Sequence, residues 1–577
     1  MAVIRAKWEV LLVMAIAVCL VLCVFGWRIA NPFNVSWLDG DIVTGQFGWE
    51  LYRADRQHWF PIATDRYSWP LAMPLAMFDN MPLIALAVKV VTPASAGPVQ
   101  YFGPVFLIGI ALQALFAWLL LREATRQRSG AAYRLALALG TLFLATSPTL
   151  LVRFQLSHMA LTQHWLLLAA LWLMARSTRV GARRTLCDFA LLQFVAAAIN
   201  IYLMAMTTMV LVGLVLKLAL DRALSRRDLL LLPLPLAAAL LAMALSGFIG
   251  FGGGKLLSGE GYQVFSANFY TLFNPMPGQF GSAFLPGLPV ATGGQYEGFA
   301  YLGLGALLLT LGGLVFTRIR ADDGDGLFQP LMVVVVGAFV LALSTRLTFG
   351  PYSVFLPVPA QVEALLGIFR SSGRFIWVVV YALMFVAIAG LIRNLPERRA
   401  ATLLGLAALI QIADLAAPFA AMHRRFAQIT QPNRFTDLAY ADLGLAHDTV
   451  LVLPAWQCQV WEPGKFEYPW TYFMKFSWLA MDNNLRINSF YGGRTPEAQV
   501  KFHCTKMPEL VLARSAAPHT AYLLSRRSFR QFGAHIAASH FCDFAEDLYV
   551  CRGDRGRSGL SERAQAEVAA NQPQTAP

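Results

Sequence analysis

Charged side chains are scarce in this sequence of 577 residues. Asp, Glu, Lys and Arg together make up 14% of the chain, whereas hydrophobic residues make up 57%. Soluble domains carry about 25% charged residues, so a water-soluble protein of this length is excluded. The mean hydropathy of +0.54 agrees with a chain that lies largely in lipid. The composition therefore predicts a polytopic membrane protein.

Several familiar sequence signatures are also missing. The chain has no Walker A motif and no glycine-rich dinucleotide fingerprint. No period of about 20 to 50 residues recurs, and no heptads persist. The sequence therefore gives no sign of a nucleotide-binding domain, and it excludes solenoid and coiled-coil architectures.

Acidic residues are outnumbered by basic ones. The chain has 33 Asp and Glu and 46 Lys and Arg, which gives a net charge of +13. Such an excess fits either a nucleic-acid-binding protein or the positive-inside rule of membrane proteins. The basic residues cluster in short segments between apolar runs: Arg122, Arg126, Arg128 and Arg134; Arg176, Arg179, Arg183 and Arg184; Lys217, Arg222, Arg226 and Arg227; Arg393, Arg398 and Arg399. If the spans alternate, these clusters share one side with Arg5 and Lys7. We therefore expect a cytoplasmic amino terminus and no nucleic-acid partner.

Eleven apolar runs approach the length that crosses a bilayer, which is roughly 20 residues for a helix. The first run follows two basic residues as in a signal peptide, but it is too long and lacks a small-residue cleavage site, so we expect it to be retained. The segment from 187 to 220 is divided at Asn200, because one span there would place the next basic cluster on the wrong side. The predicted spans cover about 9–29, 101–121, 133–151, 159–175, 187–200, 202–220, 228–250, 299–317, 329–346, 375–392 and 400–418.

The carboxyl-terminal part has a different composition, with mixed charges, short strand-like runs and turn signals. We therefore predict a mainly α transmembrane domain over 1–418 and a small α/β domain over 419–552. The final segment, 553–577, is rich in Ser, Glu, Ala, Gln and Pro and is predicted to be disordered. The topology places this small domain and the long loops 30–100, 251–298 and 347–374 outside the cytoplasm.

The seven cysteines support this orientation. Three lie in apolar segments, and the other four lie in the carboxyl-terminal part, an even number in a compartment predicted to be oxidising. Among three connectivities we favour Cys542 with Cys551 and Cys458 with Cys504. Four unpaired thiols in a cytoplasmic tail remain the alternative.

Two carboxylates one residue apart, Asp39 and Asp41, follow the first span and precede an amphipathic segment that runs from Ile42 to Arg56. We expect this segment to lie flat in the membrane interface as a helix. Asp39 and Asp41 could supply a general base where a lipid-linked head group arrives, or hold a divalent cation such as Mg²⁺ or Mn²⁺. Alternatively, either carboxylate only caps the helix.

A second acidic position precedes another outer-loop helix. Pro82 begins a helix that runs toward Lys89, and Asn80 is the expected cap, which leaves Asp79 without an obvious structural role. Asp79 and Lys89 are therefore candidates for contact with substrate, with a purely structural role for Asp79 as the alternative.

The remaining candidates lie next to predicted spans. Arg153 and His158 belong to an outer turn, where polar groups near lipid are costly and therefore often functional. Glu297, before the span at 299, either caps that helix or binds a sugar hydroxyl.

Two guanidinium groups, Arg370 and Arg374, lie one helical turn apart at the entrance to the span at 375. Because the guanidinium fork matches phosphate oxygens, we interpret this pair as a phosphate or pyrophosphate grip. Snorkelling of both side chains to the interface is the alternative.

The order of several runs resembles a known family. These runs are WLDGDIVTGQFGWELYR, FDNMPLIALAVK, VQYFGPVFLIGIALQALFAWLL, SHMALTQHWLLLAALWL, GQYEGFAYLGLGALLL and FRSSGRFIWVVVY. Together they resemble a bacterial family of multispanning proteins with a domain of unknown function, placed with the GT-C type glycosyltransferases. The resemblance covers most of residues 30 to 415 and, more loosely, the NSFYGGR run that begins at Asn488.

The resemblance implies an enzyme of the bacterial inner membrane that uses a polyprenyl-phosphate-linked sugar on the periplasmic side. Its base would be an acidic residue of the first outer loop, a role that falls on Asp41 first and Asp39 second. The expected partners are the lipid bilayer, the lipid-linked sugar and a glycan or other envelope acceptor. We expect the acidic pair and the guanidinium groups to share one cavity. A flippase for lipid-linked saccharides and a non-catalytic anchoring protein are the competing functions.

Overall fold

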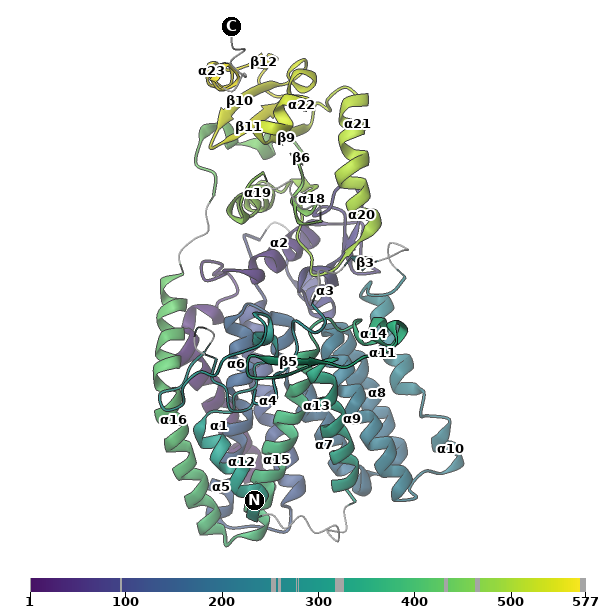
Figure 1. The fold of residues 1–577 in the computed structure, drawn as a ribbon, viewed down its shortest axis with the longest axis vertical. Helices are drawn as coiled ribbons and strands as arrows, with labels where there is room; N and C mark the ends of the chain where they lie inside the picture. Colours follow the sequence, from purple (N-terminus) through teal and green to yellow (C-terminus); the bar gives the residue numbers. More distant parts are fainter. Residues whose placement is uncertain are drawn as a thin grey trace. The chain divides into compact units, whose positions relative to one another are not determined.

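The computed structural model describes residues 2–93, 96–250, 256–257, 261–276, 278, 280–316, 326–429, 434–461 and 467–570 (Figure 1). The chain divides into two compact units. One, here called the helical unit, comprises Met1–Trp37, Gln100–Met243 and Glu260–Ile429. The other, the composite unit, comprises Leu38–Val99, Ala244–Gly259 and Thr430–Pro577.

The helical unit contains most of the long apolar helices. Its helices are α1 (Ala2–Phe25), α4 (Phe102–Ala124), α5 (Ala131–Ala145), α6 (Pro148–Gln155), α7 (Trp165–Val180), α8 (Ala182–Ile199), α9 (Ile201–Leu220), α10 (Arg226–Leu229), α11 (Leu234–Leu245), α12 (Leu304–Phe316), α13 (Phe328–Leu343), α14 (Ala360–Leu366), α15 (Ile376–Asn394) and α16 (Glu397–Gln428). Short 3-10 turns η1 (Trp27–Ala30), η3 (Met159–Thr162), η4 (Gln295–Gly298) and η5 (Ser372–Phe375) and the hairpin β4–β5 (Arg346–Phe349, Tyr352–Phe355) complete it.

Seven helical segments of the described residues are long and apolar enough to cross a membrane, as in a multi-pass membrane protein. They are Trp8–Phe25, Phe102–Ala124, Ala131–Gln155, Ile201–Leu220, Arg226–Leu245, Ser372–Asn394 and Glu397–Gln428. Each matches one of the eleven predicted spans. Of the other four, α12 and α13 are apolar but shorter, and α7 and α8 are helices that do not meet the same criteria. Eleven spans are therefore not confirmed.

The predicted division at Asn200 is confirmed. Helix α8 ends at Ile199, and Asn200 is extended, so its side chain can accept a hydrogen bond (2.9 Å) from the amide of Tyr202 and cap α9.

Small residues let the helices approach closely. A Cβ on Gly305 of α12 would come within 2.1 Å of the Ala407 carbonyl oxygen of α16, and a Cβ on Gly313 would come within 2.7 Å of Ala387 on α15. Because lipid gives apolar helices little reason to associate, such close backbone packing is a main source of their association.

The composite unit is an α/β structure assembled from three separated stretches of chain. Its first stretch holds α2 (Asp41–Ala54), β1 (Ala63–Thr64), β2 (Met73–Pro74), η2 (Leu75–Phe78) and α3 (Pro82–Val91), and its second holds β3 (Leu256–Leu257). The third holds η6 (Leu438–Tyr440), α17 (Leu443–Ala446), β6 (Thr449–Leu453), α18 (Trp456–Trp461), α19 (Trp470–Asp482), β7 (Arg486–Ile487), β8 (Thr495–Pro496), α20 (Glu497–Lys501), the π-helix η7 (Phe502–Lys506), α21 (Met507–Ala513), β9 (Thr520–Leu524), α22 (Arg526–Ala537), β10 (Phe541–Ala545), β11 (Leu548–Arg552), β12 (Gly559–Leu560) and α23 (Glu562–Ala570).

A six-stranded mixed sheet, in the order β12-β10-β11-β9-β6-β7, forms the centre of this unit. The predicted α/β character is confirmed, but the predicted boundary at 419 omits the two earlier stretches. The prediction of disorder from 553 is wrong for the described part of that tail. There β12 pairs with β10, and Ala564 and Val568 of α23 pack into the core.

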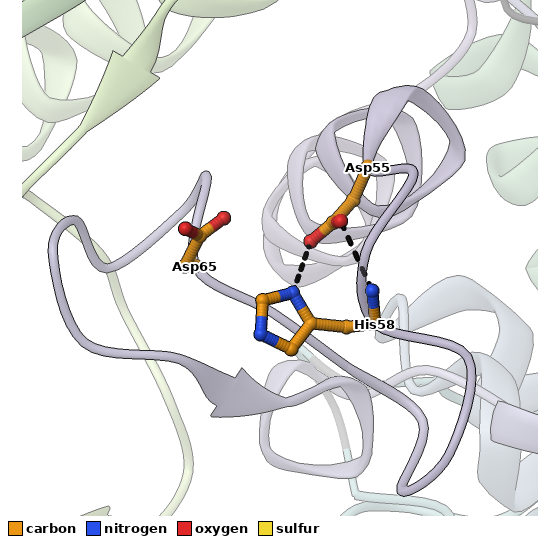
Figure 2. A group of neighbouring side chains, drawn as sticks. All are labelled: Asp55, His58 and Asp65. Atoms are coloured by element: carbon orange, nitrogen blue, oxygen red, sulfur yellow. Dashed lines mark hydrogen bonds and ion pairs between the residues drawn. The ribbon is translucent and has the colours of Figure 1, made fainter.

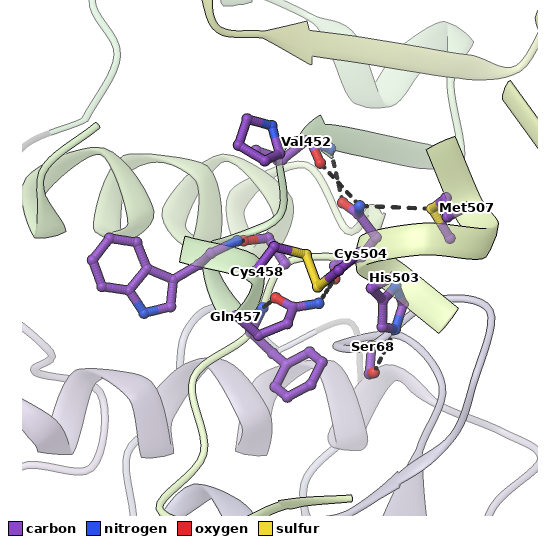
Figure 3. The surroundings of a disulfide bond; sticks show 12 residues. Ser68, Val452, Gln457, Cys458, His503, Cys504 and Met507 are labelled. Atoms are coloured by element: carbon purple, nitrogen blue, oxygen red, sulfur yellow. Dashed lines mark hydrogen bonds between the residues drawn. A yellow bond between two sulfur atoms is a disulfide. The ribbon is translucent and has the colours of Figure 1, made fainter. Parts of the chain in front are cut away.

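Both predicted disulfides are present. Cys542 and Cys551 are directly opposite one another on β10 and β11, and Cys458 of α18 is joined to Cys504 of η7 (Figure 3). Near the second bridge, the Asn488 side chain donates to the Val452 carbonyl (3.0 Å) and accepts from the Val452 amide (2.8 Å).

The segment after Asp41 is not an interfacial helix. Every residue of α2 from Ile42 to Arg53 is buried, and Phe47 packs edge-on against Trp478 of α19 at 5.1 Å. The polar face folds onto the chain before α4. Glu50 accepts from the Val99 amide (2.6 Å), and Arg53 donates to the carbonyls of 93, 96 and 97. The polar face of α2, which in the sequence resembles a water-facing side, is therefore paired with main-chain groups.

Candidate functional site

Three predicted substrate-binding residues converge in the helical unit. Arg153 of α6 donates to Glu297 (2.7 Å), and Arg374 of η5 forms a two-bond fork with the same carboxylate (2.9 and 2.7 Å). Arg153 also donates to the Tyr296 carbonyl at 2.7 Å. The side chains of Arg153 and Glu297 are almost fully buried, at 0% and 5% exposure. We call Arg153, Glu297 and Arg374 the guanidinium–carboxylate cluster.

Glycines bring the two short turns of this cluster together. A Cβ on Gly298, next to Glu297, would come within 2.7 Å of the Ala267 Cα, and one on Gly373, next to Arg374, would come within 2.8 Å of the Gly298 Cα. Only residues without a side chain permit this approach, so η4 and η5 touch and their charged neighbours meet.

Aromatic packing fixes the position of Arg153, the third residue of the guanidinium–carboxylate cluster. Phe154, the neighbour of Arg153 on α6, stacks on Phe106 of α4 at 4.0 Å and on Trp37 at 5.6 Å. The α6 turn is therefore anchored in the core, and the Arg153 side chain is directed at Glu297 with its guanidinium 5.1 Å from the Trp377 ring centre.

The cluster carries one negative and two positive charges, so it retains a net positive charge. Burial by itself raises the pKa of the Glu297 carboxyl group, but Arg374, His158 and Arg153 outweigh that effect and hold the pKa well below its ordinary value. His158 is therefore close enough to act electrostatically on Glu297. Glu297 stays ionised at every physiological pH and does not cap a span, because α12 begins only at Leu304.

Arg370 differs from Arg374. It is half-buried, its guanidinium lies 5.7 Å from the Phe265 ring centre, and no carboxylate of the described residues pairs with it. Its hydrogen-bonding fork is thus better placed than that of Arg374 to receive an anion.

An apolar cavity of about 530 Å³ lies beside these guanidinium groups. Its wall includes Met204, Leu240, Met243, Leu365, Phe369 and Phe375, with Ser372 at the same turn as Arg374. Tyr202 links the two regions: its ring packs against Phe369 (5.2 Å), and the Arg374 guanidinium lies over it at 4.6 Å. The helical unit therefore places an oily cavity and a cationic cluster side by side.

The acidic candidates belong to the composite unit. Asp39 is exposed, and Asp41 is half-buried at the first position of α2. Gly40 occupies the cap position of α2, and Asp41 is the acidic residue of its first turn. A carboxylate in the first turn still interacts favourably with the helix dipole. A shared cavity for the acidic pair and the guanidinium groups stays a prediction.

Asp79 and Asn80 have roles other than those expected. Asp79 adopts a left-handed conformation at the end of η2, with φ of 53°. Asn80 does not cap α3, which follows Met81. Its side-chain amide donates to the carbonyls of Gly45 (3.0 Å) and Phe78 (3.3 Å) instead.

Lys89 is 7% exposed, and no described residue forms a hydrogen bond or ion pair with its ammonium group. Its Nζ lies over the rings of Tyr52 (3.8 Å) and Trp59 (4.7 Å), so cation–π attraction takes the place of hydrogen bonding. Burial lowers the pKa of Lys89 to about 8, against an opposing effect of Asp55.

Sequence reasoning missed the aromatic side of the guanidinium–carboxylate cluster. Arg374, Trp377 and Tyr381 are spaced i, i+3 and i+7, which places them on one helix face and was a readable signal. Tyr202, which reaches the cluster from α9, had no such signal.

Comparison with known families covers most of the chain. A family model described as domain of unknown function DUF6311 matches residues 14–416, and one described as the DUF6311 C-terminal domain matches residues 439–553. No curated protein gives a significant match.

Proposed function

Because the chain belongs to the DUF6311 family of multispanning proteins, we propose that it is a membrane glycosyltransferase of the GT-C type. It transfers a sugar from a polyprenyl-phosphate-linked donor to an acceptor outside the cytoplasm of a bacterial cell. Neither the family model nor its description names this activity, so the proposal depends on the site.

The apolar cavity beside the cationic cluster carries the proposal. A lipid phosphate has a long hydrocarbon chain and an anionic head, and it needs an oily wall next to guanidinium groups. The cavity of about 530 Å³ and Arg370 with Arg374 provide both within one unit. Three methionines, Met204, Met209 and Met243, line it, and their flexible side chains adapt to a chain of variable shape.

We assign the roles as follows. The acceptor hydroxyl attacks the anomeric carbon, and Asp41, with Asp39 as the second candidate, takes its proton. The bond between that carbon and the phosphate oxygen breaks, and the polyprenyl phosphate leaves with the electron pair. Arg370 contacts the leaving phosphate, while Glu297 orients Arg374 and Arg153 so that their net positive charge lies nearby.

Two measurements test these roles with purified full-length protein. Asp41→Asn is expected to lower transfer of label from polyprenyl-phosphate hexoses by about 100-fold or more, while binding of polyprenyl phosphate persists. Turnover at the wild-type rate in this variant would remove Asp41 from the role of base.

Arg370→Gln is expected to weaken binding of polyprenyl phosphate. Arg346→Gln is the matched control, because Arg346 also lies over a phenylalanine ring (5.1 Å) in the helical unit but away from the cavity wall. Equal binding by both variants would contradict the phosphate grip. Movement of the lipid across vesicles without transfer would favour the flippase.

A further inference from the structure

A second group of reactive side chains lies in the composite unit, in the loop between α2 and β1. Asp55, His58 and Asp65 each offer one donor atom, and these atoms all lie within 4.8 Å of one another (Figure 2). Among the described residues, no other three histidine, cysteine or acidic side chains gather in this way. None of these three residues belongs to the proposed transferase site.

Asp55 fixes the orientation of the imidazole. One of its oxygens accepts from the amides of Gln57 (2.8 Å) and His58 (3.2 Å), and the other lies 2.8 Å from His58 Nδ1. Because both Asp55 oxygens are placed to accept hydrogen bonds, Nδ1 is the donor of this pair and Nε2 keeps the lone pair.

Figure 2 shows the carboxylates of Asp55 and Asp65 beside the imidazole ring of His58, and one donor atom of each residue lies within 4.8 Å of the others. Asp65 is half-buried, and its carboxylate makes no hydrogen bond or ion pair with any described residue. His58 and Asp65 thus each offer an electron pair within one short loop. A cation between them would satisfy both.

A carboxylate that holds Nδ1 so that Nε2 faces a metal is the usual arrangement around metal-bound histidine. Mixed nitrogen and oxygen donors suit Mn²⁺ or Zn²⁺, whereas Ca²⁺ and Mg²⁺ prefer oxygen alone. From this geometry we propose that Asp55, His58 and Asp65 form a binding site for a divalent transition metal, with His58 Nε2 and Asp65 as ligands and Asp55 as the orienting group.

Neighbouring charges set the strength of the site. The charge of Lys89 acts on Asp55, and that of Arg66 acts on both Asp55 and Asp65. These two cations offset part of the acidic charge. The His58 side chain is 30% exposed, so the site is open to solvent. We therefore expect an exchangeable ion, not one held permanently.

The test measures binding of Mn²⁺ to the full-length protein, purified in detergent and without a histidine tag. Bound Mn²⁺ is detected as a loss of the electron paramagnetic resonance signal of free Mn²⁺. We expect saturable binding of Mn²⁺. Zn²⁺ should displace the bound Mn²⁺, whereas Ca²⁺ at the same concentration should not. His58→Gln and Asp65→Asn should each weaken it at least about tenfold, and Asp55→Asn by a similar factor through loss of orientation. Lys89→Met should strengthen it.

Asp554→Asn is the matched control. His447 and Asp554 also form a histidine–aspartate pair (3.9 Å), but Arg552 already holds that carboxylate by two bonds (2.9 and 2.6 Å). This variant should bind Mn²⁺ as the wild type does. Unfolding midpoints of all variants identify any that misfold. No saturable binding, or equal binding by the wild type, His58→Gln and Asp65→Asn, would overturn the proposal.

Discussion

Replacing Glu297 by glutamine should destabilise the helical unit strongly. The substitution keeps the shape of the side chain but removes the charge that balances Arg153 and Arg374. Breaking a buried ion pair by removing one partner costs about 3 to 5 kcal/mol, because the remaining charge has no compensation. Here one carboxylate serves two guanidinium groups, and the Arg153 side chain is 0% exposed. We therefore expect a loss in the upper part of that range.

The assay is unfolding of the purified protein in mixed detergent micelles, followed by tryptophan fluorescence. Glu363→Gln is the matched control, since Glu363 is half-buried in the same unit but accepts only from the Gln263 side chain (2.6 Å) among described residues. We expect it to change stability by less than about 1 kcal/mol. Equal loss in both variants would contradict the reasoning.

A double-mutant cycle and a pH series sharpen this test. In an Arg153→Gln background the loss caused by Glu297→Gln should shrink by about 0.5 to 3 kcal/mol, because one buried charge is already absent. The folded pKa of Glu297 is depressed, so its contribution is complete above the unfolded pKa of about 4.3 and is lost as pH falls through the lower folded value. The wild type and Glu297→Gln should therefore differ by the same amount from pH 7 to pH 5.

Three further outcomes concern the composite unit. Lys89→Met should raise the unfolding midpoint at pH 7, and this gain should shrink from pH 8 to pH 10, where the wild-type ammonium with a pKa of about 8 loses its proton in the folded state first. Removing the Cys458–Cys504 bridge, which closes 46 residues, should cost about 4 kcal/mol, against about 2.6 kcal/mol for the 9 residues of Cys542–Cys551, as denaturant unfolding would measure. Gly48→Ala should cost about 1 to 3 kcal/mol because its Cβ would come within 2.9 Å of a packed phenylalanine ring, whereas Gly97→Ala, with open space around it, should cost less than about 0.5 kcal/mol.

Local signals in the sequence predicted local features well. The interruption at Asn200 followed from span length and charge placement, and the even cysteine count led to the two observed bridges. Both features depend on rules that act within one segment or one compartment, so they need no knowledge of tertiary structure.

The long-range features could not be read in the same way. The polar face of α2 carries Glu50 and Arg53, which resemble a water-facing stripe, yet they bond main-chain groups about 40 to 50 residues away. Main-chain partners leave no mark in the sequence. The cluster of Arg153, Glu297 and Arg374 shows the same limit, because each residue was a candidate alone and only the touching turns η4 and η5 make them partners.

Composition also misled the interpretation of the tail. The segment after Arg552 is polar overall, and this argued for disorder. Ala564 and Val568 are nevertheless spaced i and i+4 on α23 and pack into the core of the sheet. Helical periodicity was the better signal there.

The discontinuous composition of the composite unit has a consequence for biosynthesis. Its first stretch ends at Val99 and its last begins at Thr430, with the insertion of most apolar helices in between. At a synthesis rate of about 5 to 20 residues per second, α2 and α3 wait roughly 20 to 70 seconds for the strands of their own core. During that interval the nascent loop exposes Phe47, Trp49 and Tyr52. A chaperone that binds apolar segments of nascent chains would find a client in this waiting segment.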